Sequence, residues 1–107
     1  MQTFEFSQLF NQQQQSGKLY LEFLRVPTLS AGLYVLPAGQ PDPQQPHTED
    51  EVYYVVEGRG QIRVADEDRE IQAGSIVYVA AGVAHRFHSI TQDLQILVFF
   101  APAERGG

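Results

Sequence analysis

Hydrophobic positions recur in short runs from residue 18 onward, and residues that favour turns close each run. The runs are Leu19–Val26, Leu33–Leu36, Val52–Val56, Gln61–Ala65, Arg69–Gln72, Ile76–Val79, His85–Ile90 and Leu94–Phe100. Pro27 and Pro37 close the first two runs, and Glu57-Gly58 closes the third. No long helical period interrupts this order. The pattern predicts about eight short strands in an all-β, antiparallel sandwich or barrel.

The segment before these runs has a different pattern. Ser7 is a candidate cap for a short helix that carries Leu9 and Phe10 on one side, and Gly17 is expected to end it. The glutamine run Gln12–Gln15 is expected to be solvated.

The last run, Leu94–Phe100, is apolar at both strand parities. An antiparallel strand with one wet face alternates apolar and polar residues, so the outer face of this strand must be covered. Either the N-terminal segment or a second subunit covers it, and we predict a homodimer.

Composition limits the organisation of the chain. Its 107 residues and 12.0 kDa allow one domain, which we place at residues 18–107 after an N-terminal segment of residues 1–17. Without cysteine, the chain has no disulfide, zinc–thiolate site or cysteine nucleophile.

The charge pattern argues against two classes of partner. The net charge is −6, and the 7 basic residues are scattered, so neither nucleic acid nor an anionic membrane surface is expected. The first residues, Met1–Phe6, carry no basic residue, and Ser75–Ala84 is too short to cross a bilayer. A cytoplasmic protein is the expectation.

All three histidines lie in two short stretches, residues 39–58 and 74–89. Side chains alternate between faces in an extended chain, so that Gln45, His47, Glu49 and Glu51 share one parity. His85 and Phe87 share a face, and His88 takes the opposite one, outward. Two imidazoles and a carboxylate on inner faces would suit Fe(II), Mn(II), Ni(II) or Zn(II). Glu49 is expected to be a solvated carboxylate.

These stretches resemble the paired motifs of the cupin family. The first family motif is G-x5-H-x-H-x3-E-x6-G, which Gly39, His47, Glu51 and Gly58 match, with Gln45 in place of the first histidine. The second is G-x5-P-x-G-x2-H-x3-N, which Gly74, Gly82 and His85 match, with Ala80 and Ser89 in place of the proline and asparagine.

The resemblance implies a double-stranded β-helix, or jelly-roll barrel, that holds one divalent transition metal ion (Mn, Fe, Ni or Zn). The implied ligands are His47, Glu51 and His85, with Gln45 as a weaker fourth donor. These ligands carry one negative charge, so a divalent ion would leave the site at +1 and favour an anionic or enolate-like ligand.

The predicted function is a metal-dependent enzyme of the dioxygenase, isomerase or decarboxylase type that acts on a small oxygen-bearing or anionic molecule. Tyr53, Tyr78 and Phe87 are candidates for the substrate pocket, although core packing is the simpler role for aromatic residues. Two alternatives stay open: a non-catalytic module that binds a small molecule in the same cavity, and a metal-free structural barrel.

Overall fold

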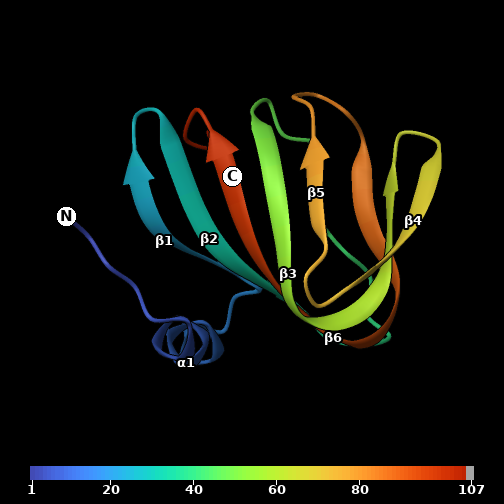
Figure 1. Cartoon of the computed structure of the whole chain (residues 1–107), viewed down its shortest axis with the longest axis horizontal. Helices are drawn as coiled ribbons and strands as arrows, with labels where there is room; N and C mark the ends of the chain where they lie inside the picture. The colour runs from blue at the N-terminus through green and yellow to red at the C-terminus, as the bar shows by residue number, and fades with distance from the viewer. Residues whose placement is uncertain (106–107) are drawn as a thin grey trace.

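In the computed structural model, which describes residues 1–105, a short helix precedes a six-stranded antiparallel sheet (Figure 1). The elements are α1 (Phe6–Ser16), β1 (Tyr20–Val26), β2 (Leu29–Leu36), β3 (Asp50–Val64), β4 (Glu67–Gln72), β5 (Ile76–Val79) and β6 (His85–Ala101). The strand order is β1-β2-β6-β3-β4, and β5 also pairs with β3. The prediction of an antiparallel all-β fold with an N-terminal helix is confirmed.

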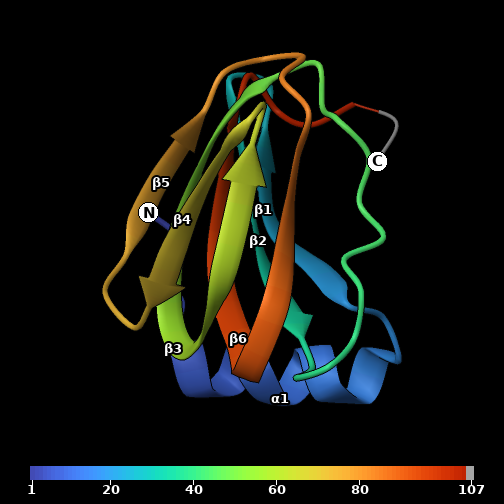
Figure 2. The same cartoon turned by 90° about the vertical axis from the view of Figure 1, so that its right-hand side faces the viewer.

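The two longest strands bend the sheet into a barrel (Figure 2). The first half of β3 pairs with β5 and its second half with β4, while β6 follows β3 through both halves. Register shifts between Val55 and Gln61 mark the bend. The expectation that Glu57-Gly58 ends a strand was therefore wrong, and two pairs of predicted strands are the halves of β3 and β6.

Gly58 makes the bend sterically possible. Its φ is +103°, and a Cβ at this position would lie 2.2 Å from the carbonyl oxygen of Asp93 on β6. A residue with a side chain would strain the backbone and collide with the neighbouring strand. Glycine here allows the strand to continue instead of stopping it.

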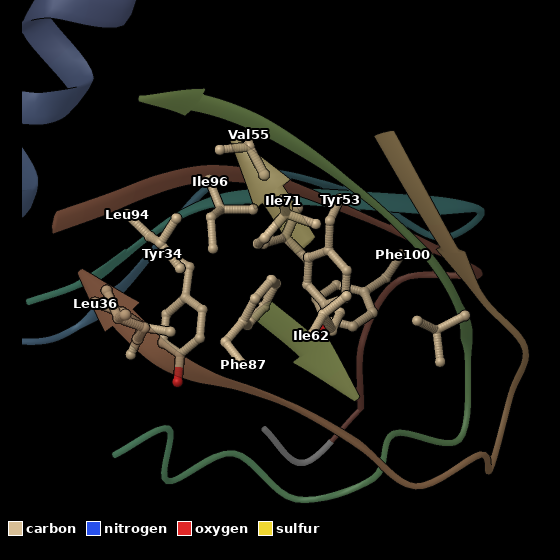
Figure 3. Close-up of a cluster of buried hydrophobic side chains, with 13 residues drawn as sticks. Tyr34, Leu36, Tyr53, Val55, Ile62, Ile71, Phe87, Leu94, Ile96 and Phe100 are labelled. Carbon is tan, nitrogen blue, oxygen red and sulfur yellow. The ribbon is translucent and has the colours of Figure 1, made fainter. Parts of the chain in front are cut away.

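Alternating side chains fill the barrel interior (Figure 3). Tyr53, Ile62 and Phe87 are at most 1% exposed and belong to one apolar cluster with residues of β2, β4, β5 and β6. Each such side chain contributes about 1.5–3 kcal/mol through burial. This core supports the first residues of β3 and of β6, which carry side chains of the candidate site.

The N-terminal helix packs against the outer face of the sheet. Leu9 is buried against Leu33 and Val35 of β2, and Leu97 of β6 lies beside this cluster. The N-terminal segment therefore covers part of the outer face of β6, one of the two covers anticipated.

The ends of the helix differ partly from expectation. It begins after Glu5 with no side-chain cap, so the prediction that Ser7 caps it was wrong, whereas Gly17 ends it as predicted with φ +72°. Gln13 is 4% exposed and donates to the carbonyl oxygens of Lys18 and Leu19, so the glutamine run is not wholly solvated. In the described part of the chain, no helix has the length and apolar character needed to span a membrane.

Candidate metal centre

His47, Glu51 and His85 meet at one end of the barrel. His47 lies in the loop before β3, Glu51 near the start of β3, and His85 at the start of β6. One potential ligand atom from each lies within 4.8 Å of the other two. In the β3–β6 ladder His85 pairs with Val64, far along β3 from Glu51. Glu51 pairs instead with Val79 of β5, and the backbone N–H of Gly82 donates to the carbonyl oxygen of His47, so the β3–β5 pairing and the turn that follows β5 bring the two predicted stretches together.

His85 has one nitrogen engaged and one open. Its Nδ1–H donates to the carbonyl oxygen of Val83 at 2.8 Å, which leaves the Nε2 lone pair facing the site. Nε2 lies 2.8 Å from Glu51 Oε1, with both side chains 1% exposed, but the geometry does not make a hydrogen bond. Burial lowers the pKa of His85, and the contacts with Glu51 and Val83 outweigh it and raise the pKa overall.

Two buried atoms of this group lack a hydrogen-bond partner among residues 1–105. They are Nε2 of His85 and Oε2 of Glu51. Buried polar atoms are costly unless they are satisfied, and a nitrogen lone pair beside a carboxylate is an arrangement that a cation satisfies. The donor set of two imidazoles and one carboxylate therefore fits a divalent transition metal ion.

His47 is oriented by a residue near the end of the chain. Its Nδ1 lies 2.9 Å from Glu104 Oε2, and a carboxylate beside Nδ1 favours the proton on that nitrogen, which leaves the lone pair on Nε2. The backbone N–H of Glu104 donates to Ser30 Oγ, and Arg25 donates to its carbonyl oxygen. Burial raises the pKa of Glu104, while His47 opposes this shift.

Sequence reasoning missed Glu104, because it lies in no motif and follows the last predicted strand. It also assigned Glu49 to solvent, which was wrong: Glu49 is 2% exposed and accepts a hydrogen bond from Thr48. The charge count from the sequence therefore omitted nearby acids. The formal charges of Glu51, an ionised Glu104 and a divalent ion sum to zero before Glu49 is counted, so the excess positive charge that favoured an anion disappears.

The loop between β2 and β3 brings a different glutamine to the site than the motif suggested. Gln44 Oε1 lies 3.4 Å from His47 Nε2 and accepts a hydrogen bond from the Tyr53 hydroxyl at 3.1 Å. Gln45, the residue at the motif position, is exposed. Prolines at 41, 43 and 46 make this loop irregular, so the alternation used to place Gln45 does not apply to it.

A cavity of about 520 Å³ opens beside the group formed by His47, Glu51 and His85. It is lined by Tyr20, Tyr34, Pro43, Gln44, Gln45, Pro46, His47, Thr48, Tyr53, Val98, Phe100, Glu104 and Arg105. Of the group itself only His47 lines the cavity, because His85 and Glu51 lie behind it in the core. The walls are mainly apolar and aromatic, which is the usual character of a small-molecule site.

The three predicted pocket residues have separate positions. Tyr53 lines the cavity, and Phe87 is buried behind it with ring centroids 4.9 Å apart. Tyr78 does not reach the cavity: it is 61% exposed on the outer face, because its parity on β5 is opposite to that of the buried Val79. His88 also faces outward, as predicted, and contacts Asp68 at 2.6 Å.

Tyr20 is a cavity residue that the sequence did not reveal. Its ring lies over Gly32 of the paired strand, where an added Cβ would come within 2.2 Å of the ring. Its buried hydroxyl has no hydrogen-bond partner among the described residues. Burial, and next the charge of Glu104, raise the pKa of Tyr20, so the hydroxyl stays protonated and able to donate.

Comparison with known proteins places this geometry in context. A family model described as "Cupin domain" matches residues 32–100. The chain is 48% identical over 104 residues to the uncharacterized protein SCO3923 of Streptomyces coelicolor, which covers 97% of this chain and 99% of that protein. Glu104 lies beyond the residues that the family model matches.

Solved structures share the fold at low identity. TT1209 from Thermus thermophilus aligns with a TM-score of 0.74 and 22% identity over 96% of this chain and 99% of that chain. KdgF from Halomonas sp. aligns with a TM-score of 0.70 and 20% identity over 78% of this chain and 76% of that chain. The DMSP lyase DddQ from Ruegeria pomeroyi aligns with a TM-score of 0.66 and 22% identity over 71% of this chain and 39% of that chain. At these identities the likeness shows the fold alone.

Proposed function

The chain belongs to the cupin family, and from this premise we propose that it is an enzyme that acts on a small oxygen-bearing molecule at a mononuclear divalent metal. One observation carries the proposal: His85 Nε2 and Glu51 Oε2 are buried, have no hydrogen-bond partner within residues 1–105, and are grouped with His47 beside a cavity of about 520 Å³. A purely structural barrel would have no need to bury these polar atoms unsatisfied.

His47, Glu51 and His85 would hold the ion, with Mn, Fe, Ni or Zn compatible with these donors. When bound, such an ion supplies Lewis-acid polarisation of a substrate oxygen. Val83 and Glu104 engage the Nδ1 atoms of the two histidines, so each imidazole has one defined open nitrogen.

The cavity residues indicate the class of substrate. Val98 and Phe100 supply apolar walls that exclude water from part of the cavity. The Tyr20 hydroxyl is a protonated donor with no hydrogen-bond partner in the described part of the chain, well suited to bind a carbonyl or hydroxyl oxygen. Because Glu104 balances the charge of a divalent ion, a neutral oxygen-bearing molecule fits this cavity better than a strongly anionic one.

Elemental analysis of protein purified without an affinity tag tests the metal. We expect about one transition-metal ion per chain and its loss in His47→Ala and His85→Ala, since three strong donors leave none to spare. His88→Ala is the matched control, because this histidine lies on β6 but faces outward. Failure of the wild-type chain to bind Mn(II), Fe(II), Ni(II) or Zn(II) would support a metal-free barrel instead.

Turnover is tested separately on the metal-loaded protein. A panel of 2-oxo acids, β-diketones and hydroxy compounds should include a molecule that is consumed only when metal is present, with oxygen uptake distinguishing oxygenation from isomerisation or decarboxylation. Tyr20→Phe should raise KM for that molecule, whereas Tyr78→Phe, which alters an exposed tyrosine, should not. Ligand binding without turnover across the panel would indicate a binding module.

A further inference from the structure

We propose that Gln44, not Gln45, supplies the neutral oxygen that completes the protein ligands of the metal. The inference rests on the metal site of the proposed function and assigns one further residue to it. It concerns a position that the motif does not mark, one residue before the place where the family motif has its first histidine.

The side-chain oxygen of Gln44 faces the site. Oε1 is 3.4 Å from Nε2 of His47 and 3.1 Å from the hydroxyl of Tyr53. Tyr53 and Glu51 are both buried at alternate positions of β3, so their side chains share the inner face of the strand. Gln44 Oε1 is thus adjacent to one histidine of the group and hydrogen-bonded to a tyrosine on the same face as Glu51.

The orientation of the Gln44 amide is determined by its neighbours. Nε2 of Gln44 donates to Asp42 Oδ2 at 2.6 Å, and a carboxylate oxygen can only accept. Turning the amide over would place its oxygen against this carboxylate and lose the hydrogen bond. The nitrogen therefore faces Asp42, and the oxygen faces His47.

The carboxylate of Asp42 is held by hydrogen bonds from two strands. It accepts hydrogen bonds from the Tyr34 hydroxyl on β2 at 2.6 Å and from the backbone N–H of Phe87 on β6 at 2.9 Å. It also accepts from the backbone N–H of Gln44 at 3.1 Å. The loop is therefore anchored to the barrel immediately before Gln44, which is the preorganisation a ligand position needs.

The 3.4 Å contact between Gln44 Oε1 and His47 Nε2 is a hydrogen bond only when Nε2 carries a proton. Glu104 Oε2 lies 2.9 Å from Nδ1 and favours the proton there, so Nε2 carries a lone pair when this imidazole is neutral. The amide oxygen of Gln44 is also an acceptor. Two acceptors that face each other repel electrostatically. A cation between them attracts both and makes the arrangement favourable, as at His85 and Glu51. An amide oxygen is a suitable ligand for Mn(II) and other hard divalent ions.

Calorimetric titration of the metal-free protein with Mn(II) tests the assignment. Gln44→Ala should weaken Mn(II) binding by about tenfold, at the lower end of the effect of removing a supporting group at a metal site. Gln45→Ala, the matched control one residue away, should bind Mn(II) like the wild-type chain. The visible absorption spectrum of Co(II)-loaded protein should change in Gln44→Ala and not in Gln45→Ala.

A second variant separates ligation from support of the loop. Gln44→Glu keeps an oxygen at the same reach but loses the donor to Asp42, so it should bind Mn(II) at least as tightly as the wild-type chain if the oxygen is a ligand. If Gln44 only supports the loop, Gln44→Glu should weaken binding as much as Gln44→Ala. Thermal melts of the metal-free variants check that each one is folded.

The outcomes separate this inference from the proposed function. Wild-type affinity in Gln44→Ala, or a loss in Gln45→Ala instead, overturns the role of Gln44 and leaves the metal site intact. A wild-type chain that binds no Mn(II), Fe(II), Ni(II) or Zn(II) overturns both.

Discussion

At the scale of single residues, the contact between His47 and Glu104 decides which nitrogen of His47 keeps its lone pair. Glu104 Oε2 lies 2.9 Å from Nδ1 and favours the proton there, and Ser30 and Arg25 hold the backbone of Glu104 in place. Partners of this kind orient a histidine ligand and raise its basicity. If the proposed metal binds, Glu104 is therefore a positioning residue for its ligand His47, supplied by the segment after β6.

Removal of this partner should weaken the metal site without removing a ligand. We expect Glu104→Ala to lower the Mn(II) affinity by about 10–100-fold, and Glu104→Gln to lower it less, because an amide oxygen still accepts from Nδ1–H. Calorimetry measures both. Glu67→Ala, at an exposed acid on β4, is the control and should leave the affinity unchanged. Equal losses in Glu104→Ala and Glu67→Ala would contradict a local role.

His88 has a role in the folded chain that is separate from the metal. Its hydrogen bond with Asp68 holds the pKa of Asp68 below the ordinary 3.8, and Arg63 acts in the same direction. Because this pKa is lower in the folded than in the unfolded chain, the contacts stabilise the fold above about pH 3.8, and their contribution is lost as pH falls through the folded pKa.

An NMR titration of the Asp68 carboxyl carbon checks this assignment. His88→Ala should raise the pKa of Asp68 toward 3.8, and Arg63→Ala should raise it less, since His88 is the larger cause. The destabilisation caused by His88→Ala should be greater at pH 6 than at pH 2. An unchanged pKa of Asp68 in His88→Ala would show that the contact is absent in solution.

At the scale of elements, the loop between β2 and β3 has an internal anchor in place of regular structure. Asp42 accepts hydrogen bonds from β2, from β6 and from Gln44, and so connects the loop to the interior of the barrel. Loops that carry functional residues need such support, because their backbone has no ladder to hold it.

Asp42→Ala should therefore be costly for both fold and site. It leaves the backbone N–H of Phe87 and the hydroxyl of Tyr34 without their acceptor, at a cost of about 2–4 kcal/mol in the free energy of unfolding. Urea unfolding measures this loss, and the Mn(II) affinity should fall as well. Asp66→Ala, at an exposed turn, is the control. A change of less than about 1 kcal/mol would mean that water replaces the carboxylate readily.

The elements also show how far sequence reasoning reached. The inward parity of Glu51 and the outward parity of His88 followed from alternation, because a strand imposes it. The continuation of β3 through Gly58 did not, since glycine both ends strands and permits bulges, and only the contact with Asp93 decides between them.

The grouping of the three candidate metal ligands was predictable, whereas their surroundings were not. His47, Glu51 and His85 were found through motif spacing, and the structure places them within 4.8 Å. Gln44 lies in a loop where alternation fails, and Glu104 acts through a contact across the chain that no local pattern records. Position along a chain predicts neighbours within an element, and tertiary closure determines the rest.

At the scale of the whole molecule, the outer face of the sheet is covered only in part. α1 covers Leu33 and Val35 and borders Leu97, which removes the original reason to expect a second subunit over β6. An apolar patch remains beyond the helix, on β5 and the first half of β3. Ile76 is 71% exposed, Tyr78 61% and Tyr54 38%, and Tyr54 pairs directly with Ile76. Such a patch is typical of a protein–protein contact.

We propose that a second copy of the chain covers this patch. Light scattering should then give a mass near twice 12.0 kDa, and Ile76→Glu should reduce it to that of one chain by placing charges in a symmetric, self-complementary contact. Val26→Glu, at an apolar position of 38% exposure on β1, is the control and should leave the dimer intact. Each chain carries −6, so mutual repulsion opposes association, and added salt should strengthen the dimer by screening it. A wild-type monomer at micromolar concentration in both low and high salt would rule out this interface.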